Sequence, residues 1–163
     1  MRPYRHGPMS TAEELITQLN SASVKKRQDA ARDLGRSKNP TAIAPLGAAL
    51  ADPHAGVRIA VLEALGRLDD PSALPFILPA LADAEPEVRA AAIATLGRIG
   101  DPSCAGALIA CLHDPEIMVR VGGCEVLGKL RASTTVPALE SLLSDPFSEV
   151  RDAAQEAIRR LGR

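Results

Sequence analysis

Aromatic residues are nearly absent from this chain of 163 residues. It has no tryptophan, and Tyr4, Phe76 and Phe147 are its only aromatic side chains. The hydrophobic fraction of 46% therefore consists almost entirely of alanine, leucine, isoleucine and valine. Alanine and leucine at this density favour helix over strand, because neither has the branched β-carbon that strands prefer. We expect an all-helical chain of one domain.

Other absences exclude classes of protein. No apolar run approaches 18 residues, so we expect no membrane-spanning helix and no membrane partner. The first ten residues lack the apolar segment of a secretion signal, and only three cysteines are present, which indicates a reducing, cytoplasmic location. The net charge of −1 lacks the cationic surplus of generic nucleic-acid binders, so no nucleic acid is expected as a partner.

The chain has instead a repeat with a period of 31 residues. Five sets of similar residues hold this spacing. They are Arg27, Arg58, Arg89, Arg120 and Arg151; Leu34, Leu65, Leu96, Leu127 and Ile158; Leu19, Leu50, Leu81, Leu112 and Leu143; Leu15, Leu46, Ile77, Leu108 and Leu139; and Asp52, Asp83, Asp114 and Asp145, with Ser21 in the first copy. Five sets at one spacing indicate five copies of one structural unit.

Each unit divides into two helical halves. Leu74, Ile77, Leu78 and Leu81 have the i, i+3, i+4, i+7 spacing of one helix face, and Asp-Pro turns separate the halves. The predicted helices are 11–20, 23–36, 41–51, 55–68, 72–82, 86–99, 103–113, 117–130, 134–144 and 148–161. The predicted units are about 11–40, 41–71, 72–102, 103–133 and 134–163, forming a single domain, 11–163, after a flexible tail, 1–10.

A helical hairpin of this size cannot bury its apolar side alone, so neighbouring hairpins must stack. Glycines at 35, 66, 97 and 128 share one register, which lets adjacent helices approach closely. Arg159 breaks this register in the last unit, and both terminal units are richer in polar residues than the middle ones. Polar outer faces are typical of terminal units, so we expect the array to end there.

The repeat resembles a known family. Asp-Pro-x-x-x-Val-Arg followed by small residues and Leu-Gly-Arg, as in DPHAGVRIAVLEALGRL and DPEIMVRVGGCEVLGKL, is similar to the short HEAT-like repeats named after phycobilisome (PBS) lyases. The resemblance covers roughly residues 11–162, although Lys26 replaces the valine in the first copy. It implies a right-handed α-α superhelix with the second helices on the concave side and the first helices on the convex side.

The most regular charged feature is a ladder of aspartates and arginines. Its members are Asp52, Arg58, Asp83, Arg89, Asp114, Arg120, Asp145 and Arg151. A row of arginines can bind anions. Alternatively, each arginine bonds an aspartate or a helix-end carbonyl within or between neighbouring units. The resemblance favours this structural role, because HEAT-like families use the pair to hold units together.

The three cysteines lie in the fourth unit, with His113 nearby. Cys104, Cys111 and Cys124 align with Ala73, Ala80 and Ile93 of the third unit, which favours packing in the core. A zinc site and redox sensing are the alternatives, although Cys111 and His113 would point in opposite directions on a helix.

The histidines offer little for catalysis. Deoxyhypusine hydroxylases, which are HEAT-like enzymes, hold two irons with repeated His-Glu pairs. Here His6, His54 and His113 are not followed by glutamate, so that activity is excluded. No nucleophile triad or phosphate-binding loop is recognisable either. We therefore expect no catalytic residues, no metal and no cofactor.

The remaining candidate is a surface on the second helices, the concave strip. Its apolar residues should face outward, and charged residues rim them. The strip consists of Ile59, Glu63, Arg67, Ala90, Ala94, Arg98, Val121 and Glu125. Apolar patches with polar rims often mark binding sites, although neighbouring helices can also cover such residues. Phe76 and Phe147 replace small or polar residues of other units and are either local plugs or a second contact point.

The sequence thus predicts a non-catalytic scaffold, adaptor or regulatory subunit that binds another protein or peptide, as a monomer or weak homo-oligomer. The resemblance suggests an alternative, a phycocyanobilin lyase-type subunit that acts on a bilin chromophore or its carrier protein. A nucleic-acid-binding solenoid is a third possibility. Residues 1–38 have eight Lys or Arg against four Asp or Glu, but Asp29 and Asp33 interrupt the basic face.

Overall fold

The computed structural model describes residues 11–162, and the tail predicted at 1–10 lies outside them. The described residues form ten α-helices arranged as five hairpins. The first helices of the hairpins are α1 (Ala12–Gln18), α3 (Ile43–Ala49), α5 (Leu74–Ile77), α7 (Ala105–Leu108) and α9 (Val136–Glu140). The second helices are α2 (Val24–Arg36), α4 (Ala55–Leu68), α6 (Pro86–Ile99), α8 (Ile117–Lys129) and α10 (Ser148–Leu161).

The second helices follow the prediction closely. The ranges predicted at 55–68, 86–99 and 148–161 coincide with α4, α6 and α10, and the other two differ by one residue. The turn before each helix matches its sequence: the Asp83 side chain accepts a hydrogen bond from the N–H of Glu85 at 3.0 Å, just before α6. An Asp side chain that bonds the backbone two residues on is a common way to fix such a turn.

The prediction of continuous first helices was wrong in the third, fourth and fifth units, where a short α-helix passes into a 3-10 segment. In the third unit, residues 71–82 form a 3-10 turn, the short α5 and a second 3-10 segment that begins at Leu78. Pro79 lacks an N–H and cannot donate the i→i−4 bond that would continue α5. The same division follows Leu108 in the fourth unit, where no proline accounts for it. The 3-10 segments are Pro40–Ala42, Pro71–Ala73, Leu78–Ala82, Pro102–Cys104, Ile109–His113, Ser133–Thr135 and Ser141–Ser144.

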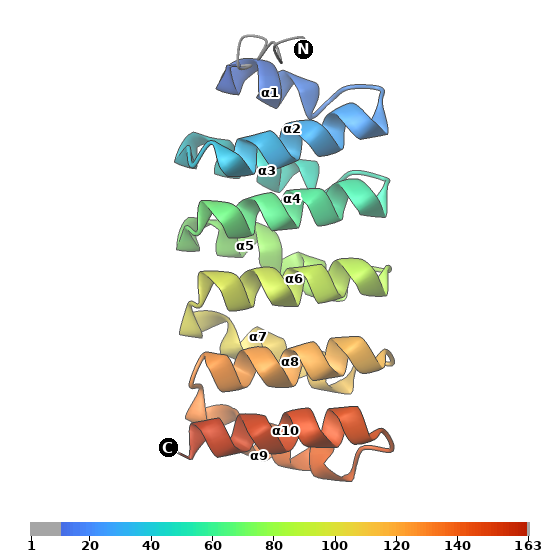
Figure 1. Ribbon diagram of the computed structural model, residues 1–163, viewed down its shortest axis with the longest axis vertical. Coiled ribbons are helices and arrows are strands. Elements are labelled where there is room, and N and C mark those ends of the chain that lie inside the picture. Colours follow the sequence, from blue (N-terminus) through green and yellow to red (C-terminus); the bar gives the residue numbers. More distant parts are fainter. Residues whose placement is uncertain (1–10, 163) are drawn as a thin grey trace, which may run out of the picture.

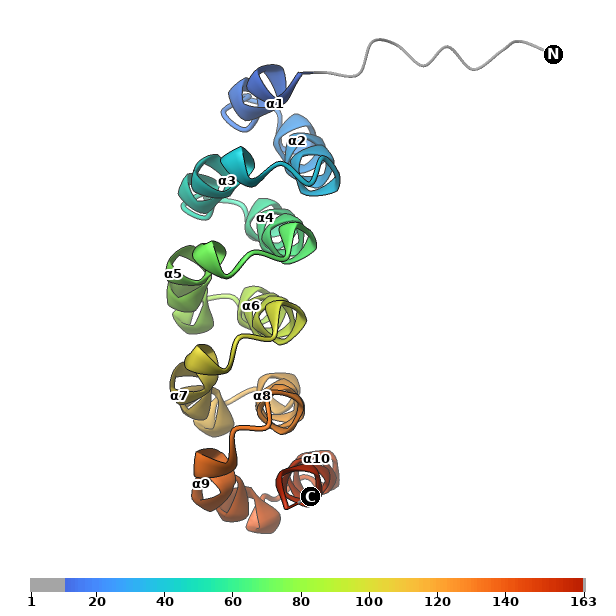
Figure 2. The same ribbon diagram turned by 90° about the vertical axis from the view of Figure 1, so that its left-hand side faces the viewer.

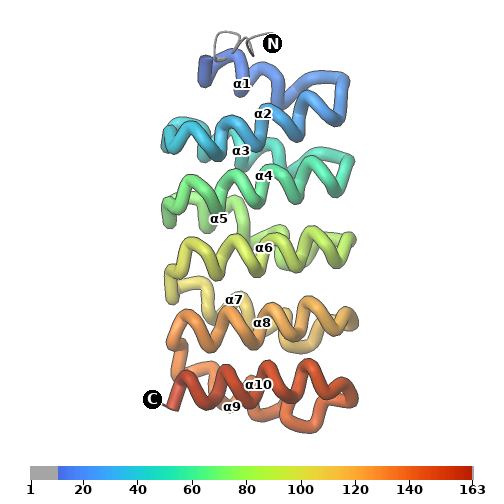
Figure 3. The backbone as a smooth tube through the Cα atoms, in the orientation of Figure 1, coloured from blue at the N-terminus to red at the C-terminus, as the bar shows by residue number. Residues whose placement is uncertain are grey.

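The hairpins stack into an all-α solenoid, as the repeat predicts. The second helices lie side by side in one row, with the first helices behind them (Figure 1). Turned by 90°, the molecule is a shallow arc, and the second helices line its inner side (Figure 2). In each unit the backbone forms one helix of each layer before it continues to the next unit. The units therefore follow one another in chain order, and α1 and α10 lie at opposite ends (Figure 3). No helix among residues 11–162 is long and apolar enough to cross a membrane.

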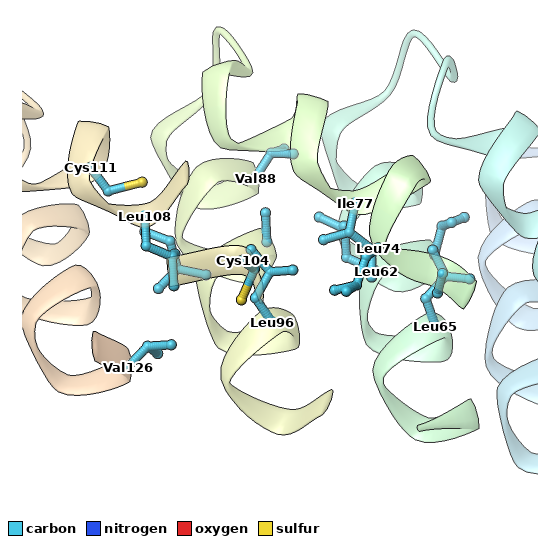
Figure 4. Packing of buried hydrophobic residues seen from close by; sticks show 14 of the residues in the cluster. Leu62, Leu65, Leu74, Ile77, Val88, Leu96, Cys104, Leu108, Cys111 and Val126 are labelled. Atoms are coloured by element: carbon cyan, nitrogen blue, oxygen red, sulfur yellow. The ribbon is translucent and has the colours of Figure 1, made fainter. Parts of the chain in front are cut away.

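The core runs without a break between the two layers. Leu34, Leu65, Leu96 and Leu127, one from each of four successive second helices, are fully buried. Leu62 packs with Leu74 and Ile77 of the first layer in the middle of the array, and Leu96 lies beside Cys104 (Figure 4). Each hairpin thus buries its apolar side against the next hairpin, which is what a solenoid requires.

Candidate protein-binding surface

The aspartate–arginine ladder links each unit to the next. Arg58 donates from Nε and Nη2 to the Oδ2 and Oδ1 atoms of Asp83, both at 2.8 Å, in a bidentate pair. Its Nη1 donates to the carbonyls of Asp52 at 2.9 Å and Pro53 at 3.3 Å, in the turn of its own unit. The same arrangement joins Arg27 to Asp52, Arg89 to Asp114, and Arg120 to Asp145.

The ladder pairs are partly buried, and this shifts the pKa of their aspartates. Burial alone would raise the pKa of Asp83, but hydrogen bonds from Arg58 and from the N–H of Glu85 outweigh it and lower the pKa below its ordinary value. The same balance lowers the pKa of Asp52 and Asp114. For Asp145 the hydrogen bond from Arg120 is the largest influence, and its pKa is also lowered.

These bonds leave little of the paired guanidiniums for an outside anion. In each of Arg58, Arg89 and Arg120, Nε and Nη2 donate to the aspartate of the next unit, and Nη1 donates to two turn carbonyls of its own unit. Arg151 keeps the turn bonds to the carbonyls of Asp145 and Pro146. Each arginine–aspartate pair, which we term a rung, links a turn of one unit to a turn of the next. The rungs therefore hold the stacked units together.

The concave strip lies on α4, α6 and α8. Ile59, Ala90 and Val121 are half-buried and pack against the core, while Ala94 is exposed. Of the charged residues, Glu63, Arg98 and Glu125 are exposed and Arg67 is half-buried. The apolar part of the strip is therefore narrower than the sequence suggests, since neighbouring side chains cover part of it.

Two adjoining grooves follow the strip. The first, the α4–α6 groove, has a volume of about 520 Å³ and is lined by Glu63, Arg67, Arg98 and other residues. The second, the α8–α10 groove, has a volume of about 630 Å³. Ala94 and Lys129 line both grooves, so the two are continuous along the concave side.

The two grooves differ in charge. The α4–α6 groove has three cations, Arg67, Arg98 and Lys129, and one carboxylate, Glu63. The charged residues of the α8–α10 groove are Glu125, Glu149, Asp152, Glu156, Lys129 and Arg160. Carboxylates therefore outnumber cations in this second groove.

Lys129 and the acidic residues of α10 were not among the site residues predicted from the sequence. A further set with the 31-residue period would have revealed Lys129: Arg36, Arg67, Arg98, Lys129 and Arg160. We term this set the cation row. Its members lie in the last turn of the second helices, where a cation interacts favourably with the helix dipole. The α10 residues were assigned to an end cap, and only the structure shows that they also line the concave side.

The cysteines and histidines form no site in the described part of the chain. Cys104, Cys111 and Cys124 are buried and have free thiols. Burial raises the pKa of Cys111 to about 11 and that of Cys124 to about 12, so both remain protonated and unreactive at neutral pH. No group of three or more potential metal ligands occurs among residues 11–162, and His6 lies outside them.

The two phenylalanines behave differently. Phe76 packs on Gly47, where an added Cβ would lie only 2.3 Å from the ring, so it fills the contact between the second and third units. Phe147 is 45% exposed, and the guanidinium of Arg120 lies 5.7 Å from the centre of its ring. Phe76 thus fills a local contact although 37% of the residue is exposed, while Phe147 offers the more exposed ring.

Comparison with solved structures places this solenoid among known proteins. One similar structure is the complex of CpcE and CpcF of phycocyanin lyase from Nostoc sp. PCC7120, with 29% identity, a TM-score of 0.80, and coverage of 98% of this chain and 68% of that chain. A designed armadillo repeat protein in complex with the peptide (KR)4 has 20% identity, a TM-score of 0.66, and coverage of 92% and 81%. Human deoxyhypusine hydroxylase in complex with glycerol has 16% identity, a TM-score of 0.51, and coverage of 93% and 84%.

The last two likenesses concern the fold alone. No curated protein matches the sequence significantly. The family of HEAT repeats matches residues 12–85 and 74–159, which is most of the chain. The Asp-Pro and Val-Arg signature, the ladder and the stacked hairpins agree with this match. The protein belongs to the HEAT repeat family.

Proposed function

We propose that this protein is a non-catalytic scaffold or regulatory subunit that binds another protein or peptide on its concave side. The observation that supports this most directly is the pair of continuous grooves along the second helices. Together they cross α4, α6, α8 and α10, and they combine half-buried apolar residues with exposed charges. A surface of this kind suits a segment of a macromolecule that lies along the array.

Two charge-introducing variants test the concave side. Val121→Asp and Ala90→Glu place a carboxylate on the apolar part of the strip, and each should weaken partner capture at least about tenfold, which corresponds to about 1.4 kcal/mol. The partner would be identified by affinity capture from the source cell followed by mass spectrometry. The melting temperature should stay within a few degrees of that of the parent protein.

The matched control is Ala107→Glu, which adds the same charge to an exposed position of α7 in the other layer. This variant should capture the partner as well as the parent does. If Val121→Asp and Ala90→Glu both bind normally while Ala107→Glu does not, the binding surface lies on the first helices.

A second candidate function is that of a bilin lyase-type subunit. The similarity to the complex of CpcE and CpcF, over nearly the whole chain, favours it. The test is the addition of phycocyanobilin to the purified protein, in which a shifted visible absorption band would indicate binding. No cysteine among residues 11–162 is exposed, so a bilin bound here would be held without a covalent bond to this part of the chain.

A further inference from the structure

The cation row has a gap in its ion pairing at the centre of the molecule. Arg36 pairs with Asp33 at 3.0 Å, and Arg160 pairs with Glu156 at 2.8 Å. Arg98 has no such carboxylate, because Ala94 occupies the position that is glutamate in the neighbouring second helices. Among residues 11–162, Arg98 and Lys129 make no ion pair within 4.0 Å.

The third central cation, Arg67, has an unsatisfied donor. Its Nη2 lies 3.8 Å from the Oε2 of Glu63, a long contact, and its Nη1 is buried without a hydrogen-bond partner among the described residues. A buried charged donor without an acceptor destabilises the folded state, because its lost hydration is not replaced. Lys129 donates from Nζ to the carbonyl of Gly97 at 2.5 Å and retains two further N–H donors. The α4–α6 groove therefore carries three cations against the single carboxylate of Glu63.

The surrounding charges restrict what can bind there. The α8–α10 groove begins at Lys129 and carries an excess of carboxylates, as described above. A long polyanion such as a nucleic acid would extend into this groove and be repelled. A short run of side-chain carboxylates would fit the cations of the α4–α6 groove alone. Charge complementarity therefore favours an acidic peptide segment.

The spacing of the cations indicates how the acidic residues are arranged. The axes of packed helices lie about 8–10 Å apart, so the helix positions that carry consecutive members of the cation row repeat at about that distance along the molecule. A polyproline-II chain rises about 3.1 Å per residue with three residues per turn, so every third side chain lies on one side, about 9 Å from the next. These two repeats match.

We propose that the α4–α6 groove binds an extended acidic segment of a partner protein, whose carboxylates at every third position contact Arg67, Arg98 and Lys129. This inference rests on the proposed function, because it assigns a partner chemistry to the same concave side. The acidic run would end before α10, where the surface charge changes sign.

Fluorescence anisotropy with synthetic peptides tests the assignment. The probe is three Glu-Pro-Pro triplets, which place glutamate at every third position of a polyproline-II helix. The controls are three Lys-Pro-Pro triplets and a peptide of the same composition with its three glutamates adjacent. The first probe should bind most tightly, and its affinity should fall as salt is raised, because the contacts are ionic.

Arg98→Ala should weaken binding of the probe about tenfold, since it removes one charge-assisted contact without disturbing an existing ion pair. Lys26→Ala removes an exposed cation outside the cation row and should leave binding unchanged. Equal binding of all three peptides, or an unaltered affinity in Arg98→Ala, would overturn the proposal. So would displacement of the probe by single-stranded DNA or by phycocyanobilin at lower concentration than by unlabelled peptide.

Binding on the concave side and recognition of an acidic segment can be tested separately. Suppose that Val121→Asp abolishes capture of the cellular partner while Arg98→Ala leaves that capture intact. The concave side is then the binding surface, and the proposal that it binds an acidic segment is wrong. If neither variant affects capture, the proposal that the partner binds on the concave side is wrong. If both weaken capture, and the captured protein contains the acidic spacing, both proposals are supported.

Discussion

One or two residues beyond each of the first four second helices, the backbone adopts a left-handed conformation. Lys38 has φ 56°, Asp69 56°, Gly100 71° and Arg131 53°, and these positions share the 31-residue register. A left-handed residue is a common way to end a helix, and glycine is the residue that adopts it without steric cost. Three of the four units therefore bear a local strain that the third unit avoids.

This strain leads to a prediction about stability. Arg131→Gly should raise the free energy of unfolding by about 1 kcal/mol, because the side-chain clash of the left-handed region is removed. The matched control is Gly100→Ala, which introduces a Cβ at the same position of another unit and should lower the free energy by a similar amount. Urea denaturation of both variants measures the effect. A loss of stability in Arg131→Gly would show that its side chain makes a contact worth more than the strain.

At the scale of elements, the second helices depend on small residues to pack on one another. A Cβ added to Gly128 would lie 2.9 Å from the Cα of Ala157 in α10, and one added to Gly35 would lie 2.7 Å from the Cα of Ala64 in α4. The obstructing atoms are backbone, so relief requires the helices to separate. Glycine is retained inside these helices although it disfavours helix formation.

Gly128→Ala should therefore destabilise the protein by about 1–3 kcal/mol, the usual cost of overpacking, despite the better helix propensity of alanine. Gly106→Ala in α7 is the control, because nothing lies within 4 Å of the added Cβ. This control should leave stability unchanged or raise it slightly. Thermal unfolding of the two variants separates packing from propensity. If both variants behave alike, close approach does not determine the glycine register.

The same elements show how far the sequence predicts the structure. Apolar periodicity and Asp-Pro turns located the second helices to within one residue, because packing and local propensity agree there. Periodicity also predicted continuous first helices, since a 3-10 segment keeps nearly the same apolar side as an α-helix. The unpaired donor of Arg67 and the place where the two grooves meet at Lys129 depend on how neighbouring units pack. The apolar pattern of one helix does not contain that information.

At the scale of the whole molecule, stability is distributed over interfaces between neighbours, because the second helices form one row (Figure 1). Each ladder arginine ties its own turn to the aspartate of the next unit, as Arg89 does with Asp114 at 2.7 Å. Four rungs of the same chemistry therefore act at four successive interfaces. A condition that weakens one rung weakens all of them together.

Acid is such a condition. The pKa values of Asp52, Asp83, Asp114 and Asp145 are lowered in the folded protein, so these groups stabilise the fold fully at a pH well above about 3.9, the ordinary pKa of aspartate. Their contribution is lost as the pH falls through the lowered values, because the unfolded chain binds protons first. Urea unfolding measured from pH 7 down to about pH 2 should thus show a decline in stability that begins near pH 5 and steepens below it. Asp114→Asn removes one titrating rung, so this variant should be less stable at pH 7 and have a shallower decline. A decline as steep as that of the parent would mean that carboxylates outside the ladder determine the acid sensitivity of the fold.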